Sequence, residues 1–385
     1  MIRYLTAGES HGKGLTVILE GFPAHLSLSS ADIDPELARR QGGYGRGGRM
    51  KIETDRIQIL SGVRGGFTLG SPITLFLENK DFVNWQKVMA SEPGPLAGTP
   101  LTRPRPGHAD LSGGIKYAQH DLRNILERAS ARETAMRVVA GAVAKKLISQ
   151  FGMTVQSHVV RIGMVASEVA LTNMEKMNQW ADVSPVRMLN PAAENKAMAL
   201  IDRATRRGDT LGGVFEVVAT GVPAGLGSHV QWDRKLDARL AQALMSLQSI
   251  KGVEIGCGFS NAARFGSQVH DAISYKRGRG FFRTTNRAGG IEGGMSNGEP
   301  LVVRAAQKPI ATLRQSLSSV DVTTKKKSIA GYERSDVCAV PAGSVIGESL
   351  VAWVLADAFL EKVGGDHLKE IQERHRLMMK RIREY

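Results

Sequence analysis

The sequence predicts an α+β protein with one large domain. Short strand-like segments alternate with longer amphipathic segments, and no Pro/Ser-rich linker divides the chain. Glycine pairs recur, but their spacing is too irregular for a solenoid repeat. The chain has 385 residues, of which 42% are apolar and 23% charged, enough for the substantial core of a globular protein. We therefore expect a single domain over residues 1–385.

The expected strands are short, rich in β-branched or aromatic residues, and bounded by Gly or Pro. They fall at residues 15–20, 56–61, 73–78, 211–220 and 300–306. Between residues 85 and 107 lie five prolines and little periodicity, which predicts an irregular loop.

The expected helices carry apolar side chains at spacings of three and four residues. They fall at residues 33–41, 133–149, 233–249 and 345–363. Asp233 is the expected cap of the third helix. We interpret the apolar stripes as core, without chemistry. Residues 365–385 are expected to form a basic C-terminal helix that packs on the domain or faces an oligomer partner.

Composition excludes several classes of protein. The N-terminal segment turns polar at once, without the apolar region of a secretory signal. The most apolar stretches, residues 135–144 and 350–360, are shorter than the ~20 residues of a membrane-spanning helix. Cys257 and Cys338 lie outside any CxxC or Cys/His cluster, so we expect reduced thiols and no metal site. These features predict a soluble, cytoplasmic protein with no membrane partner.

The charge balance is informative, because 51 Lys and Arg residues against 37 acidic residues give a net charge of +14. Such an excess suits nucleic acid, an anionic membrane surface, or small substrates with several negative charges. The positions of the arginines have to decide between these partners.

The first cluster with chemical potential is residues 8–12, Gly-Glu-Ser-His-Gly. Flanking glycines allow a sharp turn that leaves the imidazole of His11 accessible. Histidine titrates near neutrality, so an accessible one can donate a proton to a leaving group. A turn histidine on the surface is the alternative.

The second cluster, residues 39–49, places four arginines on a glycine-rich loop. It contains GxGxxG, but a helix precedes it and a strand follows, which excludes a dinucleotide-binding fingerprint. Guanidinium groups bind phosphates and carboxylates with two hydrogen bonds, and glycines let the backbone approach an anion. An RGG-like RNA segment is the rival interpretation, although such segments occur as repeats.

Three further clusters pair arginine with small or acidic residues. Prolines stiffen residues 103–110, where Arg105 and His108 could contact one ligand. In residues 127–135, Ser130 and Glu133 read as a capping box, which makes the helix start an anion site; capping alone is the alternative. Residues 308–312 and 333–336 form the fifth cluster, in which Arg334 and Asp336 offer a cation and a base, or simply a solvated ion pair.

In this order the motifs resemble those of the chorismate synthase family. They are GESHG, RRQGGYGRGGR, RPGHAD, RASARETA, QSIKGVEIG, GGIEGGMSNG, KPIATL and ERSDVCAVP, spread from residue 8 to residue 341. The resemblance implies a sandwich of β-sheets with helices packed between them, assembled as a homotetramer. It also implies a 1,4-elimination that converts 5-enolpyruvylshikimate-3-phosphate to chorismate with reduced FMN and no net redox change. That reaction is the last common step of the shikimate pathway to aromatic amino acids.

The resemblance assigns roles by motif position. His11 becomes the general acid near the leaving phosphate, His108 controls protonation of reduced flavin, and Asp336 helps flavin N5 act as base. The implied substrate-binding residues are Ser10, Arg40, Arg46, Arg49, Arg105, Arg132 and Arg334. The implied flavin-binding residues are Arg128, Ala129, Ser130, Gln248, Ser249, Gly293, Lys308, Pro309, Ile310, Ala311, Thr312 and Arg334. Ala129 departs from the serine often found in the family, which is harmless if this position contributes backbone.

The sequence also bears on how the flavin is reduced. The resemblance makes Arg40 and Arg46 candidate NADP-binding residues, with NADPH as an indirect reductant. No Rossmann-type segment and no long insertion of the kind associated with self-reduction is visible, so we expect a separate flavin reductase.

Two other functions compete with the lyase. An ordinary flavin oxidoreductase would consume reductant in proportion to product. A nucleic-acid-binding protein would bind with steep salt dependence, but 5% aromatics and a single RGG-like loop argue against it. A small, multiply anionic substrate accounts for the basic charge without nucleic acid.

Overall fold

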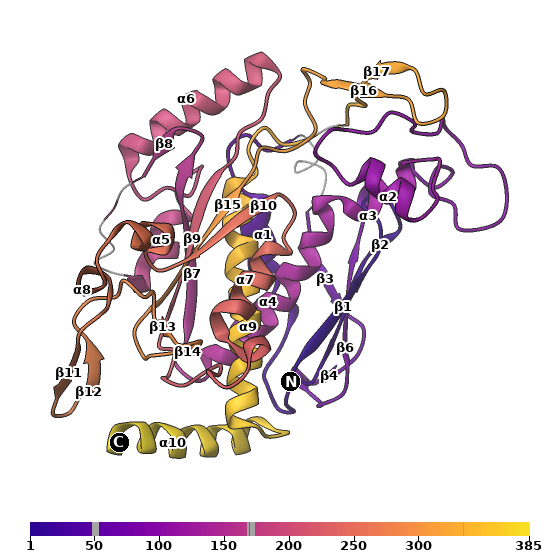
Figure 1. The fold of residues 1–385 in the computed structure, drawn as a ribbon. Helices are drawn as coiled ribbons and strands as arrows, with labels where there is room; N and C mark the ends of the chain where they lie inside the picture. The colour runs from indigo at the N-terminus through magenta and orange to yellow at the C-terminus, as the bar shows by residue number, and fades with distance from the viewer. Residues whose placement is uncertain (48–53, 168, 170–173, 334) are drawn as a thin grey trace.

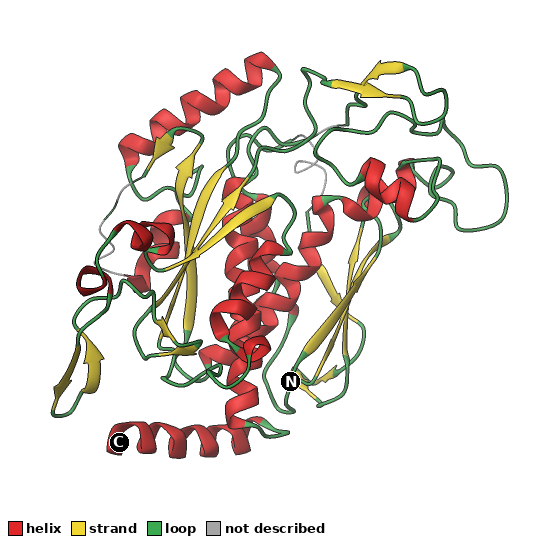
Figure 2. Cartoon of the chain, in the orientation of Figure 1, coloured by secondary structure: helices red, strands yellow, loops and turns green. Residues whose placement is uncertain are grey.

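Two β-sheets flank a layer of helices in the computed structural model, which describes residues 1–47, 54–167, 169, 174–333 and 335–385. Figure 2 shows the sheets in yellow on either side of the red helices. The first sheet, in spatial order, is β1 (Arg3–Ala7), β2 (Gly14–Glu20), β6 (Ile73–Glu78) and β3 (Ile57–Ile59). The second is β10 (Ile250–Ile255), β15 (Leu301–Gln307), β9 (Gly213–Thr220), β7 (Thr154–Ile162) and β8 (Val165–Ala166). All pairings in both sheets are antiparallel.

The central helices fill the space between the sheets (Figure 1). They are α1 (Asp34–Gln41), α4 (Thr134–Ser149), α7 (Leu236–Met245) and α9 (Val340–Val363). Helix α4 packs on β1 and β2, helix α9 packs on β7, β9 and β15, and the two helices pack on each other. Along β2, Leu15, Val17 and Leu19 are buried at every second position, so one face of the strand supplies the core. The expected sandwich with internal helices is confirmed.

Shorter elements surround this core. Helices α2 (Asp110–Lys116) and α3 (Arg123–Ala129) lie beyond the first sheet, and α5 (Met177–Ala181), α6 (Pro191–Arg207) and α8 (Gly266–Val269) lie around the second (Figure 1). The hairpins are β4 (Val63–Arg64) with β5 (Phe67–Thr68), β11 (Ile273–Lys276) with β12 (Gly280–Arg283), β13 (Ile291–Glu292) with β14 (Met295–Ser296), and β16 (Ser318–Val320) with β17 (Lys327–Ile329).

Helix α9 is longer than its sequence pattern predicted. It begins at Val340, with Pro341 in its first turn, and runs for 24 residues. By length and composition alone it could cross a membrane, so the expectation that no apolar stretch is long enough is wrong. However, 89% of its most apolar window is buried inside the fold. It is the core helix of the sandwich.

One charged side chain, Glu348, lies in the middle of this apolar helix. Its carboxylate accepts hydrogen bonds from Arg39 at 2.9 and 3.0 Å and from Ser157 at 2.8 Å, and it pairs with Lys145. Burial would raise the pKa of Glu348, but the charges of Lys145, Arg39 and Arg187 lower it well below its usual value. Arg39 therefore anchors α1 to the core, although the sequence grouped it with the arginines of the loop.

Two helix boundaries differ from the sequence prediction. Helix α7 starts at Leu236 after Lys235, whereas Asp233, the expected cap, lies in a preceding 3₁₀ turn. The same helix ends at Met245, before its predicted end at residue 249, and Ser249 takes a left-handed backbone with φ of 68° just before β10.

The two ends of the chain are tied together. Ala24 pairs with His367 in a parallel bridge, since Ala24 N–H donates to Asp366 O at 2.8 Å and Leu368 N–H donates to Ala24 O at 3.0 Å. Beyond this bridge, the basic helix α10 (Leu368–Glu384) crosses the end of α9 (Figure 1). The predicted C-terminal helix is thus present, with Ile371 as its buried side chain.

Candidate active site

The predicted site residues lie on loops that adjoin one another although they are distant in sequence. These loops follow β1, α1 and β15 or precede α2, α4 and α9. Direct hydrogen bonds join them, such as Gly47 N–H to Asp336 Oδ1 at 2.7 Å and Ser130 Oγ to Ser10 Oγ at 3.2 Å.

His11 is fixed by Glu127 of α3. Its backbone N–H donates to Glu127 Oε2 at 2.8 Å, and its ring Nδ1 lies 2.9 and 3.0 Å from the two carboxylate oxygens. Burial alone would raise the pKa of Glu127, but its bonds to His11 and the charges of His11 and Arg123 lower it below its usual value. Trp85 stacks on the imidazole, with ring centroids 4.1 Å apart. His11 is therefore held in place on two sides.

Arg40 and Arg132 are buried around the carboxylate of Asp55. Arg132 Nη1 donates to its two oxygens at 2.7 and 2.8 Å, and Arg40 Nη1 lies 3.9 Å from Oδ2. Burial, together with the positive charges of Arg132 and Arg46, lowers the pKa of Arg40 to about 9, despite the opposing charges of Asp55 and Asp336. Among the described residues, two buried guanidinium groups thus lie around one buried carboxylate, which favours binding of a further anion.

Arg46 and Asp336 form an ion pair at the edge of this group. Arg46 Nη1 lies 2.7 Å from Asp336 Oδ2, and Val337 N–H donates to Gly45 O at 2.8 Å. Gly45 has φ of +83°, and a Cβ there would lie 2.9 Å from Ile201, so only glycine suits this turn. The loop of residues 42–47 is therefore pressed against the segment that carries Asp336.

His108 belongs to a second buried group. Its Nδ1 lies 2.6 Å from Asp110 Oδ1, and Arg105 Nε donates to Asp110 Oδ2 at 2.8 Å. Arg105 Nη1 also donates to Thr312 Oγ1 at 2.8 Å. Burial would raise the pKa of Asp110, but hydrogen bonds and charge from His108 and Arg105 lower it well below its usual value. The geometry makes Arg105 the link between His108 and the 308–312 segment.

Four of the predicted cofactor residues, Arg128, Gln248, Ser249 and Lys308, form a third group beside the first two. Lys308 N–H donates to Ser249 O at 2.9 Å, and Lys308 Nζ donates to Gly107 O at 2.8 Å, next to His108. Gln248 Nε2 donates to Glu133 Oε2 at 3.2 Å, while its buried Oε1 has no hydrogen-bond partner among the described residues. Arg128 is exposed and donates to Gly8 O at 3.1 Å, beside the His11 turn. This group therefore offers one cation beside His108, one cation beside the His11 turn, and the acceptor of Gln248.

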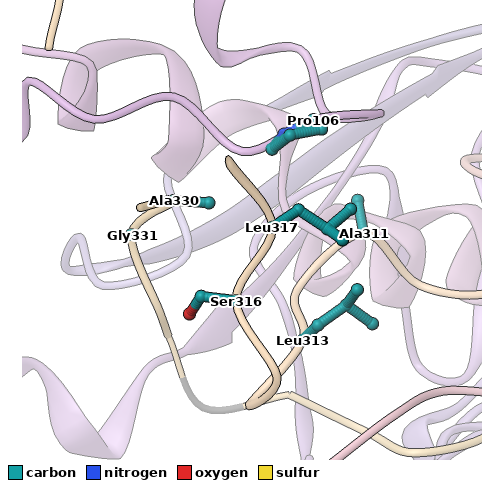
Figure 3. Close-up of a pocket in the computed structure, with 7 residues that line it drawn as sticks. All are labelled: Pro106, Ala311, Leu313, Ser316, Leu317, Ala330 and Gly331. Carbon is teal, nitrogen blue, oxygen red and sulfur yellow. The ribbon is translucent and has the colours of Figure 1, made fainter. Parts of the chain in front are cut away.

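Beside this third group, the 308–312 segment packs against the His108 loop, and the depression between them is too narrow to admit a water molecule. In Figure 3, Pro106 of the His108 loop faces Ala311 and Leu317 across it. Pro309 is exposed, and Ile310 accepts a hydrogen bond from Thr210 Oγ1 through its carbonyl at 2.8 Å. The 308–312 segment thus offers an apolar wall next to polar groups, as ligand sites commonly do.

Some predicted residues are not brought together. Gly293 lies in the β13–β14 hairpin, and its neighbour Gly294 accepts a hydrogen bond from Leu236, at the start of α7. Gln248 and Ser249 follow the other end of that ten-residue helix, about 15 Å away along its axis. Arg49 and Arg334 lie outside the described residues. Within the described residues, no group of three or more His, Cys, Asp and Glu side chains is placed to hold a metal ion.

The start of α4 differs from its predicted capping box. Ser130 Oγ accepts from Arg132 N–H at 3.3 Å, but the carboxylate of Glu133 binds Arg137 Nε at 3.0 and 3.1 Å and Gln248. The anion expected near Arg132 is present within the chain itself, as Asp55.

Several residues that shape the site had no role in the sequence analysis. Glu127 and Asp110 stand inside motifs that were quoted, and the His-x-Asp spacing of His108 and Asp110 was an available signal. Asp55 and Asn79 carry no local signal, because their partner Arg132 is 77 and 53 residues away.

Known proteins resemble the chain over its whole length. The sequence pattern of the family described as chorismate synthase matches residues 2–360. The chorismate synthase of Moorella thermoacetica is 60% identical over 379 residues, covering 97% of both chains, and that of Aquifex aeolicus is 58% identical, covering 97% of this chain and 96% of its own. A solved structure titled as the crystal structure of chorismate synthase superposes with a TM-score of 0.80 at 47% identity and covers 100% of this chain and 99% of its own.

These matches include every motif that carries the two histidines and the buried arginines. The chain belongs to the chorismate synthase family of lyases.

Proposed function

We propose that the chain eliminates phosphate and the C6 proton from 5-enolpyruvylshikimate-3-phosphate to give chorismate, the last common step of the shikimate pathway. The observation that carries this proposal is that two buried arginines, Arg40 and Arg132, lie around the single buried carboxylate of Asp55. The substrate has two carboxylates and a phosphate, and such a ligand would offset this charge. His11 and His108 border the same group of loops and can handle protons there.

Each predicted residue has a part in this proposal. Arg40, Arg46 and Arg132 would hold the anionic groups of the substrate, as would Ser10, Arg105 and the predicted Arg49 and Arg334. His11 would donate a proton to the departing phosphate, and His108 would control the proton of the cofactor. Asp336, paired with Arg46, would assist the base that removes the C6 hydrogen. Fixed charges of this kind lower a barrier because they need no reorganisation during the reaction.

The third group of residues fits reduced FMN. Lys308 and Arg128 can balance its phosphate, and Ala311 adds an apolar side chain beside them. Gln248 Oε1, which has no hydrogen-bond partner among the described residues, can accept a hydrogen bond from its ring. When bound, reduced FMN supplies an electron-rich ring that favours loss of the phosphate without net redox change. Gly293 does not join this group within one chain, and a homotetramer would allow another copy to supply it.

The supply of reduced FMN and the cellular setting complete the proposal. We assign reduction to a separate flavin reductase, with NADPH as the indirect donor and Arg40 and Arg46 as candidate NADP contacts. We place the enzyme in the cytoplasm, with no nucleic-acid or membrane partner. The basic charge is then explained by small anionic ligands.

The test is an anaerobic assay with chemically reduced FMN and enolpyruvylshikimate phosphate, in which chorismate and phosphate are followed together. We expect both products in equal amounts over many turnovers, without net oxidation of flavin. Consumption of reductant in proportion to product would instead indicate an oxidoreductase. A folded, flavin-binding protein that forms neither product would contradict the proposal.

A matched pair of variants tests the role of the arginines. Arg46→Ala should raise KM about tenfold or more, since one charged hydrogen bond contributes roughly 1.5–3 kcal/mol. Arg203→Ala removes an exposed arginine of α6 and should leave KM unchanged. Equal KM values for the two variants would remove Arg46 from the site.

A further inference from the structure

His11 and three side chains around it form a closed group. Glu127 binds its ring Nδ1, Trp85 stacks on its face, and Arg123 contacts both of these neighbours. Arg123 Nη1 donates to Glu127 Oε1 at 3.2 Å, and its guanidinium carbon lies 5.1 Å from the Trp85 ring centroid. We name these residues, His11, Trp85, Arg123 and Glu127, the His11 group. The family-derived roles use only His11 from it.

Glu127 is unusually well placed to act on the ring of His11. Its side chain is 1% exposed, against 17% for His11, so the carboxylate meets protein rather than water. It also fixes the backbone of the turn, since His11 N–H donates to Oε2 and Ser10 N–H donates to the Glu127 carbonyl at 3.0 Å. Glu127 thus holds both the ring and the backbone of His11.

The chemistry of this contact determines which nitrogen carries the proton in neutral His11. The lowered pKa of Glu127 keeps its carboxylate ionised near neutrality, and an ionised carboxylate only accepts hydrogen bonds. Nδ1 must therefore be the donor in the contact of 2.9 Å. The hydrogen bond made by one ring nitrogen decides the protonation of the other, so proton exchange with a ligand is left to Nε2.

We propose that Glu127 is a positioning residue that keeps the proton of neutral His11 on Nδ1 and commits Nε2 to proton exchange with the leaving phosphate. The identity of the ligand in this inference rests on the proposed function. The position of the proton on the imidazole ring does not.

The step balances as an elimination. The C–O bond to the phosphate breaks, and its electron pair leaves with the phosphate oxygen. The electron pair of the C6–H bond stays in the ring as the C6 proton is removed and forms a second double bond, so no ring carbon is left electron-deficient. The Nε2 proton of the imidazolium moves to a phosphate oxygen. His11 is left neutral, with its remaining proton on Nδ1 and still bonded to Glu127. Arg123 stabilises the carboxylate throughout, and Trp85 prevents the ring from rotating away.

The deciding experiment observes the imidazole directly in the full chain labelled with ¹⁵N-histidine. The chain has nine histidines, and the signals of His11 are those lost in His11→Asn. At mildly alkaline pH, where histidine is ordinarily neutral, the ¹⁵N shifts should show the proton on Nδ1 in the unsubstituted protein. In Glu127→Gln, the amide NH₂ can donate to Nδ1, so the proton should move to Nε2.

Glu9→Gln is the matched control, because Glu9 lies on the same turn with an exposed side chain. It should leave the tautomer of His11 and the turnover unchanged. A proton on Nε2 in the unsubstituted protein would overturn the proposal, whether or not Glu127→Gln folds. The same tautomer in Glu127→Gln and Glu9→Gln would overturn it as well.

Kinetics separates this inference from the proposed function. If both are correct, Glu127→Gln should lower kcat about 10²–10⁴-fold with little change in KM, as expected for loss of a general acid. If no protein forms chorismate but the tautomer shifts as stated, only the proposed function fails. If the unsubstituted protein forms chorismate and the tautomer does not shift, only the role of Glu127 fails.

Discussion

Arg132 and Asp55 form a buried ion pair across 77 residues of sequence, with Nη1 2.7 Å from Oδ1. Each residue is 4% exposed, and Arg40 shares the same carboxylate at 3.9 Å. Among the described residues, this one aspartate therefore pairs with two buried arginines, and it comes from the segment just before β3, outside the eight motifs that carry the resemblance.

Asp55→Asn should destabilise the protein by about 3–5 kcal/mol, because it removes the buried carboxylate that two buried guanidinium groups share. Urea denaturation at neutral pH measures the loss. Arg56→Ala is the control, since Arg56 is 72% exposed and pairs with Asp34 at 3.1 Å. That exposed pair should contribute less than about 1 kcal/mol. If Asp55→Asn and Arg56→Ala lose the same free energy of unfolding, the ion pair at Asp55 contributes little to stability.

Glu348→Gln should make the free energy of unfolding depend less on pH in the acid range. The pKa of Glu348 lies below its ordinary value of 4.5 in the folded protein. Its contribution is therefore fully present above about pH 4.5 and is lost as the pH falls towards the folded-state pKa. We expect the free energy of unfolding of Glu348→Gln to fall less steeply below pH 4.5, although it is lower at pH 7 because Arg39 and Lys145 lose their partner.

Urea denaturation from pH 3 to pH 7 measures both effects. Glu361→Gln, an exposed position near the end of the same helix, provides the comparison and should keep the original slope. If the free energy of unfolding of Glu348→Gln falls with pH as steeply as that of the unsubstituted protein, the acid sensitivity comes from other carboxylates, such as Asp110.

Gly141→Ala should destabilise the contact between α4 and α9. A Cβ at Gly141 would lie 2.3 Å from Ser349 Cβ and 2.5 Å from Ser349 Cα, so the two helix backbones must separate. Overpacking of this kind costs about 1–3 kcal/mol. The double variant Gly141→Ala with Ser349→Gly should recover part of the loss, because the clash with Cα remains. A thermal melt in which Gly141→Ala matches the unsubstituted protein would show that the helices can shift freely.

Asp110→Asn should lower turnover about 10²-fold through its effect on His108. Asp110 is 2% exposed and holds the ring at 2.6 Å, and an amide cannot replace its charge. If Asp110 acts through His108, then adding Asp110→Asn to His108→Ala should lower kcat little further. Fully additive losses in kcat would contradict that coupling. The free energy of unfolding should fall in either background, since Arg105 loses its partner.

Periodicity predicted the core elements well and missed strands that lack it. Residues 133–149 and 73–78 match α4 and β6 closely, because each presents one apolar face. Strand β7 was missed because it is buried on both faces, with Gln156, Ser157 and His158 inside, so it does not alternate. Helix α6 was missed although Asn190 caps it, Pro191 opens it and Gly208 ends it, which are readable signals.

The site was predictable only where its chemistry lies within a motif. The histidines and arginines could be named because each stands among glycines or prolines in a short segment. Their partners depend on folding: Asp55 reaches Arg132 and Asp336 reaches Arg46 only once the sheets and helices pack together. The direction of a side chain also could not be predicted from the sequence. Arg39 and Arg40 are adjacent, yet Arg39 points to Glu348 and Arg40 points to Asp55.

The bridge between Ala24 and His367 also has a consequence for biosynthesis. The first sheet is made within the first 78 residues, yet Ala24 has no backbone partner until the ribosome has added Asp366 and Leu368. The hydrogen bond between Gly47 and Asp336 also cannot form until late in synthesis, because the two residues are 289 positions apart in the sequence. Contacts of such long sequence separation form slowly. A nascent chain should therefore expose an incomplete, basic active site for most of its translation, and should depend on chaperones during that interval.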